Sequence, residues 1–216
     1  MKFYSQFFAL LILLGFIFSC NCNPAGERFD SEKIDPLQFV FEFEGREREY
    51  FVWLPANFDK SKKYWVLVIA HGGGEVNSGR RFWMTKPIWK CAQQKGLDVI
   101  IVTPTFHKPD PIPERYPIKE GQFLSEIIDR IKKDYKVFPK ILLTGYSRGG
   151  QFSHRYTLWY PDRVQACAPF AAGSWTTPDG RLLDPALGEI KNPNEFLLSI
   201  TDKEKLRLLS EGPPQV

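Results

Sequence analysis

Cysteine is scarce in this chain, with four residues among 216. Cys20 ends an apolar run and Cys22 lies in a polar stretch, while Cys91 and Cys167 fall on a predicted helix and a predicted strand. A cysteine within an apolar element behaves as a small buried hydrophobic residue. The sequence therefore favours free thiols over a disulfide framework, and we predict neither a disulfide nor a metal site.

The chain also lacks a concentration of positive charge. Its net charge is +4, both signs are interspersed, and no basic stripe alternates with aromatic residues. A basic face of that kind is the usual mark of a nucleic-acid-binding protein. The composition therefore gives no reason to expect a nucleic-acid partner. The length suggests one domain with a full hydrophobic core.

The one long apolar run lies at the N-terminus, at residues 7–18. It is too short to span a bilayer and follows Lys2, which is typical of a signal peptide. Residues 17–20, Ile-Phe-Ser-Cys, resemble the lipobox of bacterial lipoproteins, in which the cysteine is lipidated. We predict a lipoprotein-type signal peptide at 1–20 with lipidation at Cys20, and a polar, flexible tether at 21–36.

This prediction places the protein in the bacterial cell envelope, held on the membrane by a lipid anchor. The alternative is an ordinary cleaved signal peptide, which would leave the protein secreted or periplasmic.

Hydrophobic patterns divide the remainder into strands and helices. Strands are predicted at 39–43, 49–54, 65–70, 97–102, 141–143, 164–170 and 195–200, and helices at 87–94, 122–135 and from Ser147 to Pro161. The first two strands form a hairpin, and the later ones alternate with helices. That order predicts an α/β fold, in which a mostly parallel sheet carries helices on both faces.

The most informative stretch is Gly145-Tyr146-Ser147-Arg148-Gly149, placed between a predicted strand and a predicted helix. This is the G-x-S-x-G pattern in the context that a nucleophile elbow requires. The turn is so tight that the serine takes a strained conformation and side chains on its neighbours would clash. We predict that Ser147 is a nucleophile; the alternative is a glycine-rich turn with an incidental serine.

A second motif, His71-Gly72-Gly73-Gly74, directly follows the predicted strand 65–70. Backbone N–H groups of such a loop point to where an oxyanion forms during acyl transfer. We predict the N–H of Gly72 or Gly73 as one donor and that of Arg148 as the other. His71 is expected to be structural and to fix the loop by a hydrogen bond. The alternative is a flexible glycine turn.

Taken together, these residues resemble the α/β-hydrolase superfamily, in the esterase branch with poly(3-hydroxybutyrate) depolymerase-like and feruloyl esterase-like proteins. The stretches that carry the resemblance are FVWLPANFDKSKKYWVLVIAHGGG, KILLTGYSRGGQFSHRYTLWYPDRVQACAPFAAG and, more loosely, EFLLSITD. The resemblance implies the α/β-hydrolase fold, a small or polymeric ester as substrate, an acyl-enzyme on Ser147 and no cofactor. It also implies a triad in the order serine, acid, histidine.

The triad acid is only partly legible. Asp202 follows the predicted strand 195–200, at the place where the resemblance puts the acid. Glu204 is a near alternative, and a solvated charge is the other reading. Asp179 and Asp184 lie in an excursion after strand 164–170 and are expected to be loop-forming.

The triad histidine is the departure from the family pattern, because the chain has only three histidines and none follows residues 195–200. His154 is seven residues beyond Ser147, about 10 Å along a helix, and lies too far away to act as a base. His107 lies in a proline-rich loop and could be a migrated base. We therefore expect residues 37–216 to form an α/β-hydrolase domain that is incomplete at its C-terminus, with the eighth strand absent.

Two other functions stay open. A serine peptidase of the prolyl-oligopeptidase type suits Gly149-Gly150, although no propeller domain precedes the serine. A non-catalytic, membrane-tethered binding protein would keep the pocket without the base. Near the glycine loop, a group of basic and aromatic residues either walls the acyl pocket or covers the sheet. This group is Arg80, Arg81, Phe82, Trp83 and Trp89.

Overall fold

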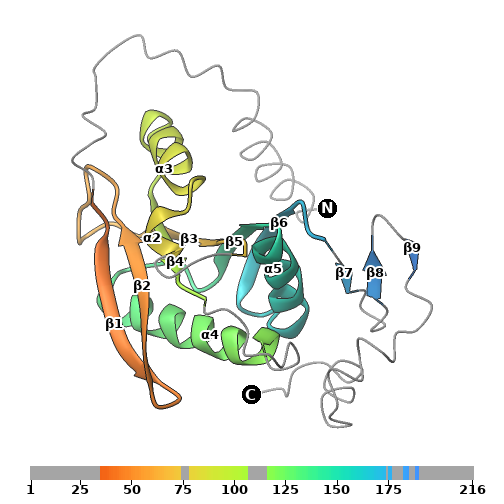
Figure 1. The fold of residues 1–216 in the computed structure, drawn as a ribbon. Coiled ribbons are helices and arrows are strands. Elements are labelled where there is room, and N and C mark those ends of the chain that lie inside the picture. Colours follow the sequence, from red (N-terminus) through yellow and green to blue (C-terminus); the bar gives the residue numbers. More distant parts are fainter. Residues whose placement is uncertain are drawn as a thin grey trace.

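The computed structural model of the protein describes residues 35–73, 78–106, 116–173, 175–176, 182–184 and 188–189. The strands are β1 (Leu37–Phe43), β2 (Arg46–Trp53), β3 (Trp65–Ala70), β4 (Val99–Pro104), β5 (Ile141–Tyr146), β6 (Val164–Phe170), β7 (Trp175–Thr176), β8 (Leu182–Asp184) and β9 (Gly188–Glu189). The helices are α2 (Ser78–Arg81), α3 (Thr85–Gln94), α4 (Tyr116–Asp134) and α5 (Arg148–Trp159) (Figure 1). The predicted signal segment, the strand 195–200 and the predicted tether, apart from its last two residues 35 and 36, lie outside the described residues.

Six strands form one sheet in the order β1-β2-β4-β3-β5-β6. The hairpin strands pair antiparallel with each other, and β2 pairs antiparallel with β4. The four strands from β3 to β6 are mutually parallel. The predicted hairpin and mostly parallel sheet are therefore confirmed. A smaller sheet joins β7, β8 and β9, in the excursion where the sequence predicted only loops.

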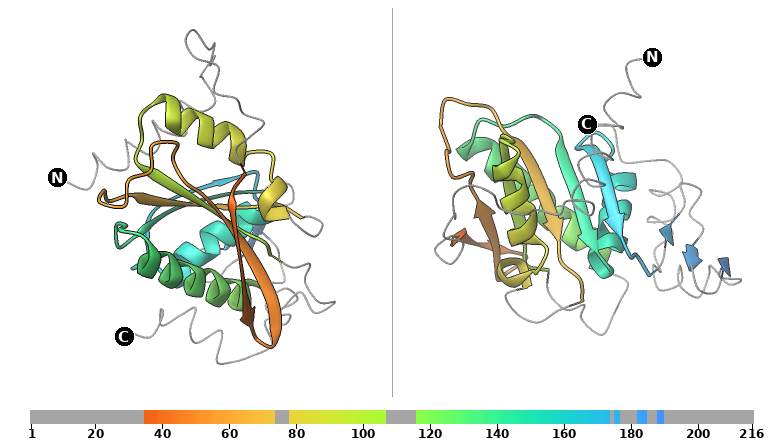
Figure 2. Two further views of the ribbon diagram at one scale, coloured as in Figure 1. Left: turned by 90° about the vertical axis from the view of Figure 1, so that its left-hand side faces the viewer. Right: turned by 90° about the horizontal axis from the view of Figure 1, so that it is seen from above.

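Helices cover both faces of the large sheet, with α3 on one side and α4 and α5 on the other (Figure 2). The alternation of side chains along β3 explains why both faces need cover. Val66 and Val68 belong to the hydrophobic core under α4 and α5, whereas Leu67 and Ile69 belong to the core under α3. A strand buried in this way has no polar face, as its continuous apolar sequence predicted.

The connections reverse direction in the middle of the sheet. From β3 the chain crosses through α3 to β4 on one side, and from β5 it crosses through α5 to β6 on the other. The carboxyl ends of β3 and β5 therefore flank a topological switch point, where ligands of open α/β sheets bind. The loop that begins at His71 and the turn at Ser147 both lie there.

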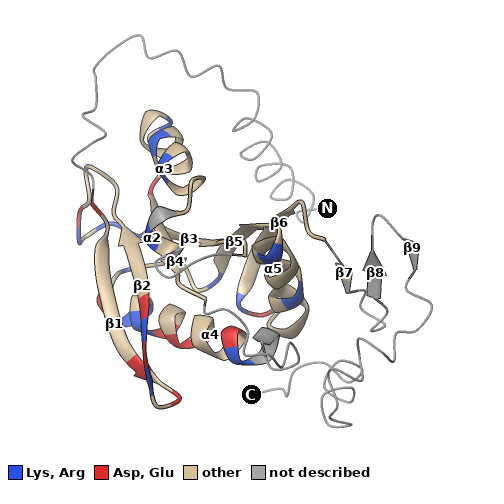
Figure 3. Cartoon of the chain, viewed as in Figure 1, with Lys and Arg blue, Asp and Glu red and all other residues tan. Residues whose placement is uncertain are grey.

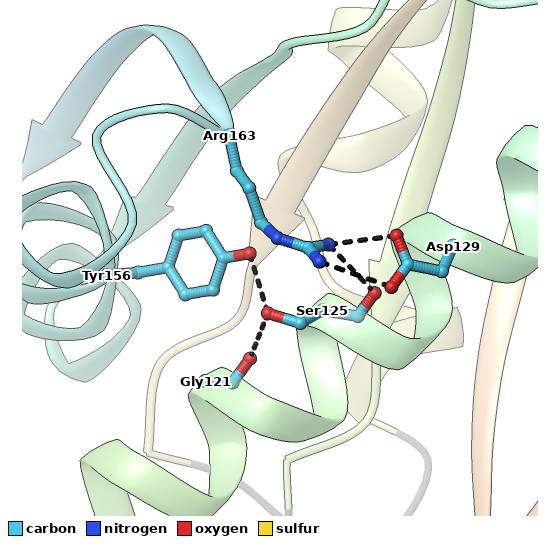
Figure 4. A network of polar contacts seen from close by, with 5 residues as sticks. All are labelled: Gly121, Ser125, Asp129, Tyr156 and Arg163. Carbon is cyan, nitrogen blue, oxygen red and sulfur yellow. Dashed lines mark hydrogen bonds and ion pairs between the residues drawn. The ribbon is translucent and has the colours of Figure 1, made fainter. Parts of the chain in front are cut away.

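A polar network fastens α4 to α5 and to the turn before β6 (Figure 4). The Ser125 hydroxyl donates to the Gly121 carbonyl at 2.9 Å and lies 3.1 Å from the hydroxyl of Tyr156. Arg163 holds both carboxylate oxygens of Asp129, at 2.9 and 3.2 Å. These contacts fix the position of α5, the helix that begins directly after Ser147.

Two helices begin earlier than the sequence pattern indicated. Helix α3 begins at Thr85, two residues before Pro87, and α4 begins at Tyr116, just before Pro117. Proline is compatible with the first turn of a helix, because the N–H that it lacks has no partner there. A proline near the boundary was therefore compatible with helix in both places. None of the helices in the described ranges is long and apolar enough to cross a membrane.

Candidate active site

Ser147 lies in a strained turn between β5 and α5. Its backbone angles are φ 54° and ψ −116°, a region that non-glycine residues rarely occupy. Its N–H donates to the carbonyl of Phe170 at 2.9 Å, which fixes the turn to the end of β6. This is the geometry predicted for a nucleophile elbow, and strain of this kind is typical of functional sites.

Glycines around the serine allow close backbone contacts that a side chain would prevent. A Cβ on Gly145 would lie 2.4 Å from the carbonyl carbon of Gly149, and one on Gly149 would lie 2.1 Å from the Ala70 oxygen. A Cβ on Gly150 would lie 2.6 Å from the Phe170 oxygen. The start of α5 is thus pressed against the end of β3, which brings Ser147 close to the loop that follows β3.

The glycine loop reaches the serine. A Cβ on Gly72 would lie 3.7 Å from the Ser147 Cβ, and one on Gly73 would lie 3.9 Å from the guanidinium carbon of Arg148. The structure therefore brings together the four residues in which the sequence placed the nucleophile and the oxyanion donors. Arg148 begins α5, where backbone N–H groups have no partner within the helix and the helix dipole favours negative charge.

His71 fixes the glycine loop, as the sequence analysis expected. Its Nδ1 lies 2.7 Å from the carbonyl oxygen of Gly72, and the N–H of Phe106 donates to its Nε2 at 2.8 Å. A carbonyl only accepts, so Nδ1 carries the proton and Nε2 the lone pair. Burial lowers the pKa of His71, in agreement with this neutral form. Both nitrogens are engaged, so His71 is not free to act as a base.

The segment just after β4, where Phe106 donates to His71, is held in turn by a buried ion pair. Arg48 on β2 donates to the carbonyl of Thr105 at 3.3 Å and to the carboxylate of Glu120 on α4 at 2.6 Å. Burial raises the pKa of Glu120 to about 7, although the Arg48 charge opposes this. Charges of both signs occur on the hairpin and on α4 (Figure 3). The pair therefore links β2, α4 and the residue that precedes Phe106.

His154 is not arranged as a catalytic base. It lies about two turns along α5 from Ser147. Its Nδ1 is 3.1 Å from the Gly150 carbonyl, and its ring lies 4.8 Å from that of Trp175. Burial lowers its pKa to about 4. The ring of His154 therefore packs between α5 and the segment that follows β6.

The aromatic residues after the glycine loop divide between the two interpretations offered by the sequence. Trp89 is buried in the core under α3 and donates its indole N–H to the carbonyl of Leu54, so it covers the sheet. Phe82 packs partly against the same core. Trp83 is 62% exposed, and its ring meets that of Tyr146 edge to face, with centroids 5.7 Å apart. Trp83 therefore lies beside the site, next to the residue that precedes Ser147.

A family model described as the alpha/beta hydrolase fold matches residues 66–190. The matched range is more than half of the chain and contains both the glycine loop and the elbow. The chain belongs to the α/β-hydrolase family. Its six-stranded mixed sheet and its strand–elbow–helix unit agree with that membership.

Solved structures of esterases resemble this α/β hydrolase. A CE1 ferulic acid esterase from the anaerobic fungus Anaeromyces mucronatus is 21% identical with a TM-score of 0.58, over 71% of this chain and 65% of that chain. The same enzyme in complex with ferulic acid is matched with 20% identity and a TM-score of 0.53, over 73% and 66%. Another ferulic acid esterase is 26% identical with a TM-score of 0.50, over 61% and 58%. The chain thus spans less than two thirds of each of these proteins.

Several predicted site residues lie outside the described residues of this α/β hydrolase. They are the acid candidates Asp202 and Glu204, the alternative base His107, the third loop glycine Gly74 and the lipidation candidate Cys20. Sequence reasoning missed the exposed ring of Tyr146. It occupies the variable position of G-x-S-x-G, where the motif constrains no side chain and gives no signal.

Proposed function

We propose that this α/β hydrolase cleaves a carboxylic ester through an acyl-enzyme on Ser147. The observation that carries the proposal is the contact between the glycine loop and the elbow, with Gly72 against Ser147. A nucleophile beside backbone N–H donors and a helix N-terminus suits acyl transfer, because negative charge develops on the carbonyl oxygen during attack. The similarity to ferulic acid esterases supports an ester as the substrate.

In the proposed reaction the Ser147 oxygen attacks the ester carbonyl and its proton passes to a base. The N–H groups of Gly72 or Gly73 and of Arg148 stabilise the oxyanion. The proton is then delivered to the departing alkoxide, which leaves as the alcohol, and water hydrolyses the acyl-serine in the same way.

We propose no base among the described residues. His71 is engaged at both nitrogens and His154 faces Gly150, so neither described histidine fills this role. Asp202 remains the proposed acid.

The proposal is tested with a fluorophosphonate probe, which reacts with an activated serine, followed by mass spectrometry of the labelled peptide. We expect label on Ser147 and none on the Ser147→Ala variant. Ser61→Ala, at an exposed loop serine, is the matched control and should label normally. Hydrolysis of p-nitrophenyl butyrate should fall by about 10³-fold or more in Ser147→Ala. Labelling or hydrolysis that survives this substitution would contradict the proposal.

A further inference from the structure

We propose that Trp83 and Tyr146 form an aromatic corner that binds a planar ring carried by the substrate. The inference rests on the proposed ester hydrolysis and adds to it the class of group that the site recognises.

The first observation is that the side chains of Trp83 and Tyr146 are both exposed to solvent. Among the described residues, the exposed large hydrophobic side chains are Leu37, Val40, Trp83 and Tyr146. Leu37 and Val40 lie singly on the outer strand β1, where isolated exposed apolar side chains are common. Trp83 and Tyr146 are instead in contact with each other, at 62% and 39% exposure. Contiguous exposed aromatic surface is typical of a binding site.

The second observation is that the two aromatic side chains lie beside the glycine loop and Ser147. The Tyr146 ring lies against the glycine loop, since a Cβ on Gly72 would be 3.8 Å from the Tyr146 Cδ1 and 3.7 Å from the Ser147 Cβ. Trp83 continues the surface outward from Tyr146. A group bound in the aromatic corner therefore contacts Tyr146, which directly precedes Ser147 and whose ring lies next to the glycine loop. It would lie close to an ester carbonyl held for attack.

Geometry favours a ring over a flexible chain. The planes of the two side chains meet at 79°, so that each presents a face at nearly a right angle to the other. A planar ring in such a corner stacks on one face and directs its edge at the other, which are the two preferred aromatic arrangements. Phe82 supports Trp83, because the centroids of the two rings are 6.0 Å apart and Phe82 packs partly on the core under α3.

The ring can be carried by the acyl group or by the alcohol, and substrate pairs distinguish these sources. Methyl 3-phenylpropanoate is compared with methyl 3-cyclohexylpropanoate, and benzyl acetate with cyclohexylmethyl acetate. In Trp83→Ala we expect the aromatic-to-saturated ratio of kcat/KM to fall about threefold to tenfold for one pair. Trp83→Phe should restore most of that ratio. The pair affected identifies the side of the ester that carries the ring.

The control is Val40→Ala, which truncates another exposed apolar side chain, on the edge strand β1, and should leave both ratios unchanged. Thermal unfolding of each variant checks that it folds, and Tyr146→Leu provides a second test of the aromatic corner. Ratios that stay unchanged in both Trp83→Ala and Tyr146→Leu would overturn the proposal.

A measurement of ligand binding tests the aromatic corner independently of ester hydrolysis. In the Ser147→Ala background, ligand-observed NMR measures binding of methyl 3-phenylpropanoate and of benzyl acetate, with and without Trp83→Ala. If no ester is hydrolysed by the unsubstituted protein, ester hydrolysis fails as the function while this measurement still decides the aromatic corner. Binding of one ligand that is lost with Trp83 supports the aromatic corner, and binding unaffected by Trp83→Ala, or absent for both ligands, overturns it.

Discussion

The backbone N–H of Phe106 donates a hydrogen bond to Nε2 of His71 at 2.8 Å, so that a single imidazole joins the end of β4 to the loop after β3. The other nitrogen of the ring holds the Gly72 carbonyl. The position of the proposed oxyanion donors therefore depends on a side chain that has no role in proton transfer.

Replacing His71 by alanine should lower the proposed activity while leaving the proposed nucleophile, Ser147, in place. A displacement of about 1 Å at a reacting centre can reduce the rate about 10²-fold, and we expect His71→Ala to lose kcat/KM on that scale. Loss of the hydrogen bond from the Phe106 N–H to Nε2 should lower the free energy of unfolding by about 1–3 kcal/mol. Ester hydrolysis and denaturant unfolding provide the two measurements. His154→Gln, at the other described buried histidine, is the control, and full activity of His71→Ala would contradict the assigned role.

Gly149→Ala should prevent the elbow from forming. A Cβ there would lie 2.1 Å from the Ala70 oxygen and 2.6 Å from the His71 oxygen, both of them backbone atoms that cannot move aside alone. We expect loss of the folded protein or a destabilisation of at least about 3 kcal/mol, measured by denaturant unfolding. A Cβ on Gly121, within α4, would meet side chains rather than backbone, with Tyr160 nearest at 3.2 Å, Tyr156 at 3.6 Å and Trp159 at 3.9 Å. Gly121→Ala should change stability by about 1 kcal/mol or less, and equal effects of the two substitutions would contradict the interpretation.

Stability should depend on pH through Glu120. Its folded-state pKa is raised to about 7 from an ordinary 4.5, because burial outweighs the charge of Arg48. Between these values the unfolded chain binds fewer protons than the folded one, so the free energy of unfolding falls as pH rises. Unfolding at about pH 5 and about pH 8 should therefore show a smaller pH-dependent loss in Glu120→Gln than in the unsubstituted protein. Glu126→Gln, at a more exposed carboxyl of the same helix, is the control.

Lipidation at Cys20 stays a prediction from the sequence alone. The protein expressed in bacteria should incorporate radiolabelled palmitate and sediment with membranes, because acylation of that cysteine would anchor it. Cys20→Ser should abolish incorporation, whereas Cys22→Ser, two residues further on, should retain it. Incorporation that persists in Cys20→Ser would exclude this site.

The sheet and the elbow could be predicted because both leave local signals. The run WVLVIA at 65–70 is β3 residue for residue, and the strand 164–170 is β6. The position of Ser147 followed from glycines whose close contacts are steric and therefore visible in the sequence.

The rest depends on contacts between distant segments. Nothing near Phe106 indicates that its N–H meets His71, which is 35 residues earlier. The pairing of Arg48 with Glu120 spans 72 residues. The orientation of Trp83 toward Tyr146 is likewise set by where α2 and α3 lie on the sheet. The sequence alone therefore could not decide whether this aromatic side chain walls the acyl pocket or covers the sheet.

The positive φ of Ser147 has a thermodynamic consequence for this α/β hydrolase. Holding a β-carbon at that position opposes folding by about 1–3 kcal/mol. Glycine would relieve the strain and return only about 0.4–1 kcal/mol of it as extra freedom of the unfolded chain. Ser147→Gly should therefore melt at a higher temperature than the native protein, while Ser147→Ala, which keeps the β-carbon, should gain less. If the proposed role of Ser147 as nucleophile were no longer needed, replacing this residue by glycine would therefore leave a more stable protein.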